Sequence, residues 1–130
     1  MTRLLPSALM LAAFACAATP AAAASGPSRQ CFYASELSSW KEVGDRAVNL
    51  RVGVNDLYRL DLLGPCPDLP WAESIGIETR GGSNQICSGL DVSLIVSGSV
   101  THTVPQRCMA TSLRKLSKAE ADALPRSQRP

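Results

Sequence analysis

The stretch VNLRVGVNDLYRLDL, residues 48–62, decides the fold of this chain, because apolar and polar residues alternate in it on both sides of a turn. That period of two is typical of strands that bury one face. Asn55-Asp56 supplies turn chemistry between the two runs. The segment therefore predicts a β-hairpin whose inward residues are Val48, Leu50, Val52, Val54, Tyr58, Leu60 and Leu62.

Shorter runs of the same kind continue along the chain, separated by glycine, serine and proline. They lie at Ile75–Ile77, Asn84–Cys87, Val92–Val96, Val100–Val104 and Cys108–Leu113. Regularly spaced short strands with turn residues between them are typical of a sandwich or barrel. We predict a mainly β, single-domain fold of six to seven short strands, stapled by disulfides and followed by a C-terminal helix.

Two segments favour helical structure. Ser35 is a candidate cap for a short helical turn that places Leu37 and Trp40 on one face. Ser117-Lys-Ala-Glu120 is a capping box, with Leu116 at the position of a hydrophobic staple residue. Pro125 ends this second helix. Between the strands, Cys66–Ala72 is expected to be irregular or a single turn, capped by Asp68 and with Trp71 packed inward.

The N-terminus has the layout of a secretory signal peptide. Arg3 precedes an apolar stretch from Leu4 to Ala18, and Ala22-Ala23-Ala24 is a small-residue cleavage site. We expect a signal peptide at 1–24, a flexible linker at 25–30, the β-rich domain at 31–124 and a disordered tail at 125–130. A competing interpretation makes Cys16 the lipid anchor of a lipoprotein.

The four cysteines after the leader predict disulfides. They are Cys31, Cys66, Cys87 and Cys108, and an even count in a small exported chain is typical of a disulfide framework. Structural zinc sites use close ligand pairs, and these cysteines are 21 or more residues apart. Four cysteines allow three connectivities. Of these we favour Cys31–Cys108 with Cys66–Cys87.

Composition excludes several classes of partner. The formal net charge is only +2, and acids are interleaved with the basic residues, so the basic stripe of a nucleic-acid binder is absent. No later segment reaches the ~20 apolar residues of a transmembrane helix. The sequence contains no phosphate loop, dinucleotide fingerprint, EF-hand loop or H-E-x-x-H, and we predict no cofactor and no metal.

The residues that chemistry would require are few. His102 is the one histidine, placed on the same strand face as Val100 and Val104, where a local hydrogen bond is expected. The acids Asp61, Asp68, Glu73, Glu78 and Asp91 include possible acid–base pairs, but turn and cross-strand roles explain them. Trp40, Tyr58 and Trp71 are expected to be core residues. We assign no catalytic residue.

Several of these residues together resemble a known family. They are Cys31-Phe32, Trp40, Tyr58-x-Leu60-x-Leu62, Cys66-Pro67-x-Leu69, Ile75-Gly76, Ile86-Cys87-x-Gly89, Cys108 and Leu116-Ser117-x-x-Glu120. The chain resembles a family of small exported proteobacterial proteins that is known only as a domain of unknown function. In that family an acid often follows the glycine after the third cysteine directly, whereas here Leu90 precedes Asp91. The resemblance implies a Gram-negative periplasmic setting and carries no activity.

Three hypotheses about function follow. The first is a non-enzymatic binding or envelope-associated structural role, with a protein or another envelope component as partner. The second is a small periplasmic hydrolase that uses His102 with a nearby acid. The third is an inhibitor of an exported hydrolase, which would need an exposed, rigid loop such as Gly64–Leu69.

Overall fold

A computed structural model of the chain describes residues 31–98 and 104–130. The expected signal peptide, the linker and Cys16 lie outside the described residues, and so do His102 and most of the strand expected at Val100–Val104. The fold class predicted from the sequence, mainly β with a C-terminal helix and disulfides, is confirmed.

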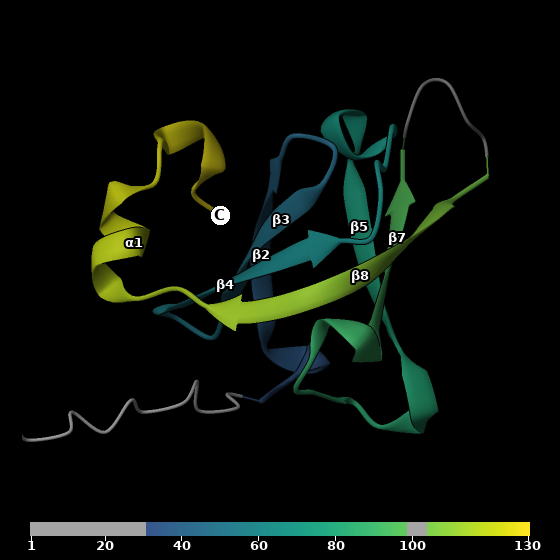
Figure 1. Ribbon diagram of the computed structural model, residues 1–130, viewed down its shortest axis with the longest axis horizontal. Helices are drawn as coiled ribbons and strands as arrows, with labels where there is room; N and C mark the ends of the chain where they lie inside the picture. Colours follow the sequence, from purple (N-terminus) through teal and green to yellow (C-terminus); the bar gives the residue numbers. More distant parts are fainter. Residues whose placement is uncertain (1–30, 99–103) are drawn as a thin grey trace, which may run out of the picture.

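A six-stranded antiparallel sheet, curled around its core, forms most of the molecule (Figure 1). Its spatial order is β2-β3-β4-β8-β7-β5. The bounds are β2 (Leu37–Val43), β3 (Ala47–Val52), β4 (Asp56–Leu62), β8 (Gln106–Lys115), β7 (Val92–Ser97) and β5 (Ser74–Thr79). The hairpin predicted over residues 48–62 is the pair β3–β4, although Val54 lies in the turn and is 80% exposed.

The long strand β8 joins the two halves of the sheet (Figure 1). Its first half pairs with β7 and its second half with β4. The register against β4 shifts between Asp61, opposite Ser112, and Leu62, opposite Ala110, so Thr111 is an extra residue in β8. Such a bulge bends a strand and increases its twist, which lets one strand serve both halves of a curled sheet.

A second, two-stranded sheet packs against the core. It consists of β1 (Phe32–Tyr33) and β6 (Gln85–Ile86), paired antiparallel. Phe32 and Ile86 are buried, and the Phe32 ring lies 4.8 Å from the Tyr58 ring between centroids. The core also contains Val48, Leu50, Leu60, Leu69, Val92, Leu94 and Val96.

The disulfides differ from the favoured connectivity. The structure joins Cys31 to Cys87 and Cys66 to Cys108, with Cα–Cα distances of 4.2 and 5.9 Å. The prediction of Cys31–Cys108 with Cys66–Cys87 is therefore wrong. The β1–β6 pairing places Cys31 opposite Cys87, and the hydrogen bond from Leu63 N to Met109 O holds the loop after β4 against Cys108. Two-residue strands have no detectable period, so the sequence did not reveal the first of these pairings.

The helical segments are short. They are η1 (Ala34–Glu36), η2 (Leu69–Trp71), η3 (Arg80–Gly82), η4 (Gly89–Asp91), α1 (Lys118–Ala123) and η5 (Arg126–Gln128). The capping box of α1 is confirmed: Ser117 Oγ accepts from Glu120 N, and Glu120 accepts from Ser117 N. A short turn, η1, forms at Ala34–Glu36, but Tyr33 rather than Ser35 precedes it. The prediction that Leu37 and Trp40 lie on one face of this turn is wrong, because both belong to strand β2.

The C-terminal segment folds back onto the outer face of the sheet, where its end lies beside β2 and β3 (Figure 1). Gln128 O accepts from Asn49 Nδ2 at 2.8 Å, and Pro130 O accepts from Arg51 Nε at 3.1 Å. Residues 125–130 are therefore ordered, and the expectation of a disordered tail is corrected. The alternating pattern predicts that Asn49 and Arg51 face solvent. In the structure, residues 79 positions further along the chain cover them, which a local pattern does not indicate.

Removing the Asn49 side chain should loosen this cover. Asn49 is fully buried, and its amide is the donor to Gln128 O. We expect Asn49→Ala to lower the free energy of unfolding by about 1 kcal/mol, the usual net contribution of one such bond. Chemical denaturation measures the change. Lys41→Ala, at the partly exposed position opposite Asn49 in β2, is the control and should change stability by less than about 0.5 kcal/mol.

Candidate functional site

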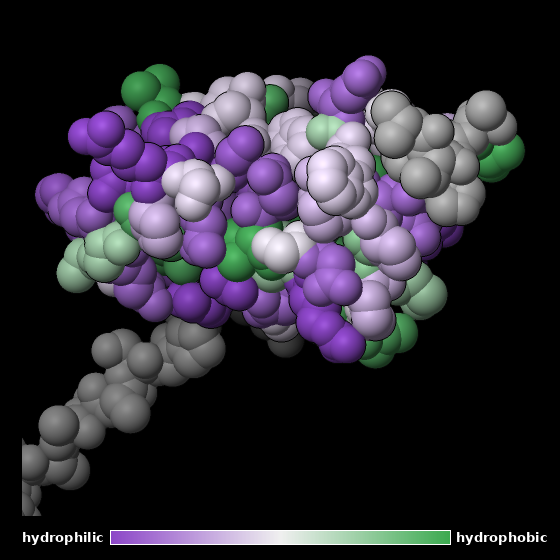
Figure 2. Space-filling view, turned by 90° about the horizontal axis from the view of Figure 1, so that it is seen from above, coloured by the Kyte–Doolittle hydropathy of each residue, from purple (hydrophilic) through white to green (hydrophobic). Residues whose placement is uncertain are grey.

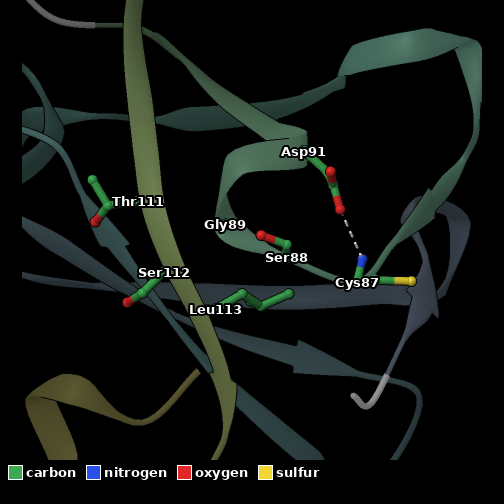
Figure 3. A pocket seen from close by; sticks show the side chains of 7 residues that line it. All are labelled: Cys87, Ser88, Gly89, Asp91, Thr111, Ser112 and Leu113. Atoms are coloured by element: carbon green, nitrogen blue, oxygen red, sulfur yellow. Dashed lines mark hydrogen bonds between the residues drawn. The ribbon is translucent and has the colours of Figure 1, made fainter.

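A groove of about 430 Å³ lies where η4 packs on β8 (Figure 3). It is open to solvent, and its lining combines hydroxyl and carboxylate side chains with the apolar side chain of Leu113. Two segments that are distant in sequence form its walls. The lining residues are Cys87, Ser88, Gly89 and Asp91 from one segment, and Thr111, Ser112 and Leu113 from β8.

The groove depends on a close approach between Gly89 and the bulged part of β8. A Cβ atom on Gly89 would lie 2.6 Å from Ser112 Cα and closer still to the backbone N and C of Ser112. Real Cβ contacts are never this short, so only glycine allows η4 to rest on the strand. The bulge in β8 lies next to Ser112, and Ser112 is also the residue that Gly89 contacts. A change in the bend of β8 would therefore move the surface on which η4 rests.

The polar groups of η4 are held in place by local hydrogen bonds. Ser88 Oγ caps η4 by accepting from Leu90 N at 3.2 Å, and Asp91 Oδ2 accepts from Cys87 N at 3.4 Å (Figure 3). Cys87 is in turn fixed by its disulfide to Cys31. Ser88 is an acceptor in its bond, so its hydroxyl proton remains available for a ligand. The expected turn role of Asp91 agrees with this arrangement.

Asp61 lies next to the groove on β4 and is connected to it through Ser112. Ser112 Oγ donates to Asp61 Oδ2 at 2.7 Å, and Arg59 Nε donates to Asp61 Oδ1 at 3.0 Å. Partial burial raises the pKa of the Asp61 carboxyl, but the hydrogen bonds from Ser112 and Arg59 outweigh it and hold that pKa below its ordinary value. A carboxylate stabilised in this way is a weak base, so it does not activate Ser112 as a nucleophile.

The lowered pKa of Asp61 predicts a dependence of stability on pH. The ionised group stabilises the fold above the ordinary carboxyl pKa of about 3.9, and this contribution disappears as the pH falls through the lower pKa of the folded state. Near neutral pH, Asp61→Asn should cost less than about 1 kcal/mol, since the side chain is 37% exposed. Thermal unfolding of both proteins should show this difference shrinking as the pH falls below the ordinary carboxyl pKa of about 3.9. A difference that grows on acidification would contradict the assignment.

The other candidate acids do not join Asp61 and Asp91. Glu78 forms an ion pair with Arg107 on the surface, and Glu73 precedes β5. Asp68 is buried at the start of η2, where its backbone N donates to Gln106 Oε1. Among residues 31–98 and 104–130, no three of the histidine, cysteine, aspartate and glutamate side chains gather as a metal site. Asp91 thus lines the groove, Asp61 is bonded to the lining residue Ser112 from β4, and His102 lies outside the described residues.

The predicted inhibitor loop is rigid but only partly exposed. Cys66, Asp68 and Leu69 in Gly64–Leu69 are buried, and Pro65 and Pro67 remain on the surface. Cys66 N also donates to Asp45 O at 2.7 Å. The expectation that Trp71 packs inward is wrong, because it is 70% exposed and Leu69 takes the core position in η2. Tyr58 is a core residue as expected, and Trp40 packs at the edge of the core.

A polar cluster lies away from the groove, at the β4–β8 end near α1. Lys115 Nζ is 2.7 Å from an Asp56 carboxylate oxygen, and this hydrogen bond raises the pKa of the Lys115 ammonium group. Burial raises the pKa of the Tyr58 phenol beside it. Both groups are therefore protonated near neutral pH, and neither acts as a base there.

Comparison with known proteins agrees with the resemblance seen in the sequence. The model of a family of unknown function (DUF6491) matches residues 1–130. The chain belongs to this family. No curated protein and no solved structure matches the chain. None of the helices described for this family member is long and apolar enough to cross a membrane.

Sequence reasoning missed the most important residues of the groove in this family member. Thr111 and Ser112 bear no motif. Gly89 belongs to the segment Ile86-Cys87-x-Gly89 that carries the family resemblance, but in Ser88-Gly89 it reads as an ordinary turn residue. The bulge in β8 follows from the register against β4, which a single strand does not encode. The only available signal was the position of Gly89 two residues after Cys87.

Proposed function

We propose that this chain is an exported, disulfide-stabilised binding domain that recognises a protein partner of the cell envelope through the η4–β8 groove. The observation that carries the proposal is the fixed geometry of this groove. A disulfide holds the wall that contains Cys87, the contact between Gly89 and Ser112 joins this wall to β8, and hydrogen bonds orient the polar side chains. A site that is ordered before binding loses little entropy when its partner arrives.

The chemistry of the groove supports binding over catalysis. The carboxylate that lines the groove, Asp91, accepts a backbone N–H, and Asp61 on the neighbouring strand β4 is bound by Ser112 and Arg59. General acid–base catalysis uses groups with pKa values near the working pH, and the lowered pKa of Asp61 lies far from neutrality.

The shape of the groove supports a protein partner. Sites for small molecules are mostly apolar and enclose most of the ligand surface. This groove is open and lined by hydroxyl and carboxylate side chains, which suits a segment of another protein laid across it. Away from the groove, the face shown in Figure 2 carries scattered hydrophobic residues among polar ones.

Two observations support the proposed location outside the cytoplasm. Both disulfides require an oxidising compartment to form and persist. The sequence of residues 1–24 has the layout of a signal peptide. A Gram-negative periplasm satisfies both conditions. Fractionation of cells that produce the full chain tests this part of the proposal directly.

Site-specific photo-crosslinking in cells tests the binding site. A crosslinking amino acid at Leu90, which is 63% exposed in η4, should give a discrete adduct with one protein. The matched control is Val54, which is 80% exposed in the β3–β4 turn and does not line the groove. Asp91→Asn should weaken the Leu90 adduct, since it removes the charge and keeps an acceptor for Cys87 N.

The partner identified from the adduct should then bind the purified chain, and Asp91→Asn should weaken that binding by about tenfold, as for one charged hydrogen bond. Adducts that are equal at Leu90 and Val54, or a Leu90 adduct insensitive to Asp91→Asn, would overturn the assignment of the groove. Turnover of any substrate that is abolished by His102→Ala would overturn the binding role itself and favour the hydrolase.

A further inference from the structure

The two edges of the six-stranded sheet differ in how they are protected. Strand β2 has a register irregularity between Leu37 and Ser39, has Lys41 in its middle, and is contacted by η2 and η5. Bulges, lysines and covering segments are the features by which proteins block pairing at a sheet edge. At the opposite edge, β5 pairs with β7 over Ser74–Thr79 without a shift.

Strand β5 has neither a register shift nor a lysine, and its one charged residue, Glu78, is paired with Arg107. Its sequence is Ser-Ile-Gly-Ile-Glu-Thr, without lysine or proline. Ile75 and Ile77 are half-buried against the core, while Ser74, Gly76 and Glu78 are exposed on the other face. An edge strand leaves every second N–H and C=O without a ladder partner, so β5 presents a regular template for another strand.

We infer that β5 pairs antiparallel with β5 of a second copy of this chain, about a two-fold axis at Gly76. Residues directly opposite each other in a sheet lie on the same face, so the axis must pass through a residue. An axis at Gly76 places Ile75 opposite Ile77 of the other copy, twice, and Ser74 opposite Glu78. An axis at Ile77 would instead place Ile75 opposite Thr79, and Gly76 opposite Glu78.

In the register about Gly76, the residues of β5 make favourable pairs with the same strand of another copy. On this basis we assign the partner as a second copy of the chain. Its inner face gains two isoleucine pairs, and such apolar cross-strand pairs stabilise a sheet. On the outer face the one acid of the strand, Glu78, meets a neutral serine, and its charge is already balanced by Arg107 across β7. No like charges oppose each other. The interface is well below ~1,000 Å², so the dimer is weak and forms at high local concentration.

Sedimentation velocity of the disulfide-bonded chain tests this inference over about 10 μM to about 1 mM. Wild type and the control Gly76→Ala should both dimerise. A Cβ at Gly76 would make only an ordinary 3.7 Å contact with Ile95 Cβ, so alanine fits, and Gly76 is exposed. Gly76→Lys or Gly76→Glu alone should weaken the dimer at least tenfold, because like charges meet at the axis. An equimolar mixture of the two should restore it.

A second pair of variants tests the register without changing Gly76. Ser74→Lys faces Glu78 of the other copy and should tighten the dimer, whereas Ser74→Glu should weaken it. Wild type that stays monomeric throughout the series would overturn the inference. Dimerisation unaffected by the charges at Gly76, or a mixture that fails to recover, would equally overturn it. If a Gly76 variant does not fold, the opposite effects of the two Ser74 variants remain decisive.

Discussion

Replacing both Cys66 and Cys108 with alanine should destabilise this protein more than any other pair of substitutions considered. The bridge closes a loop with a sequence separation of 42, which corresponds to about 4 kcal/mol of unfolding free energy in the chain-entropy treatment. Cys66 is fully buried and Cys108 nearly so, and their loss also leaves a cavity in the core. Since small domains are stable by about 5–15 kcal/mol, the variant should be barely folded.

The matched control is the double variant Cys31→Ala with Cys87→Ala. Its loop is slightly longer, with a separation of 56, so the entropic contribution is also about 4 kcal/mol. Cys31 is exposed, however, and its removal leaves no comparable cavity. Urea denaturation without reductant should show the larger loss for the Cys66–Cys108 pair. Equal losses would show that burial of the sulfur atoms contributes nothing.

A peptide map provides an independent test of the connectivity. Cleavage after lysine and arginine places the four cysteines on four different peptides. Without reduction, the peptide 60–80 should remain joined to 108–114, and the peptide with Cys31 to 81–107. Recovery of 60–80 joined to 81–107 would restore the connectivity favoured by the sequence and contradict the structure.

Gly89→Ala should produce the second largest effect. The added Cβ would overlap the backbone of Ser112, and backbone atoms of a paired strand cannot move aside as a flexible side chain can. We expect a loss of about 3 kcal/mol, at the upper end of overpacking effects, together with displacement of η4 from β8. Chemical denaturation measures the loss, and binding of the partner found by crosslinking should decrease in parallel.

Gly64→Ala is the control for this prediction. Nothing lies within 4 Å of a Cβ at Gly64, and its backbone needs no left-handed conformation. The change should therefore stay below about 1 kcal/mol in either direction. A Gly89→Ala protein as stable as Gly64→Ala would mean that η4 does not rest on β8 as described.

Local patterns predicted most of the sheet correctly. The β3–β4 hairpin, β5, β7 and the capping box of α1 all follow from alternation, turn residues and hydroxyl–carboxylate pairs within a few residues. The errors occurred where packing overrode a local pattern: Leu37 and Trp40 suit one face of a helical turn, but they belong to strand β2, paired with β3. Trp71 was expected to pack inward on hydrophobicity, but Leu69 occupies that position because η2 is anchored by Cys66 beside it.

The candidate site could be predicted only in fragments. Asp61 and Asp91 were recognised as acids in strand and turn, and both roles agree with the structure. Only Asp91 lines the groove, and Asp61 is linked to it through Ser112, which the sequence did not single out. Ser112 lies beside the bulge at Thr111 and contacts Gly89. The bulge depends on the pairing of β8 with β4, and the contact depends on the packing of η4 on β8, so neither can be seen in the local sequence.

The sequence by itself determined that this chain is a small, mainly β domain with paired cysteines, because alternation and turn chemistry act over a few neighbouring residues. The tertiary structure alone decided which cysteines pair, that the C-terminal segment covers Asn49, and that η4 and β8 form a groove. These features join residues more than twenty positions apart. Contacts of that range depend on strand order and register, which arise only when the whole sheet closes around its core.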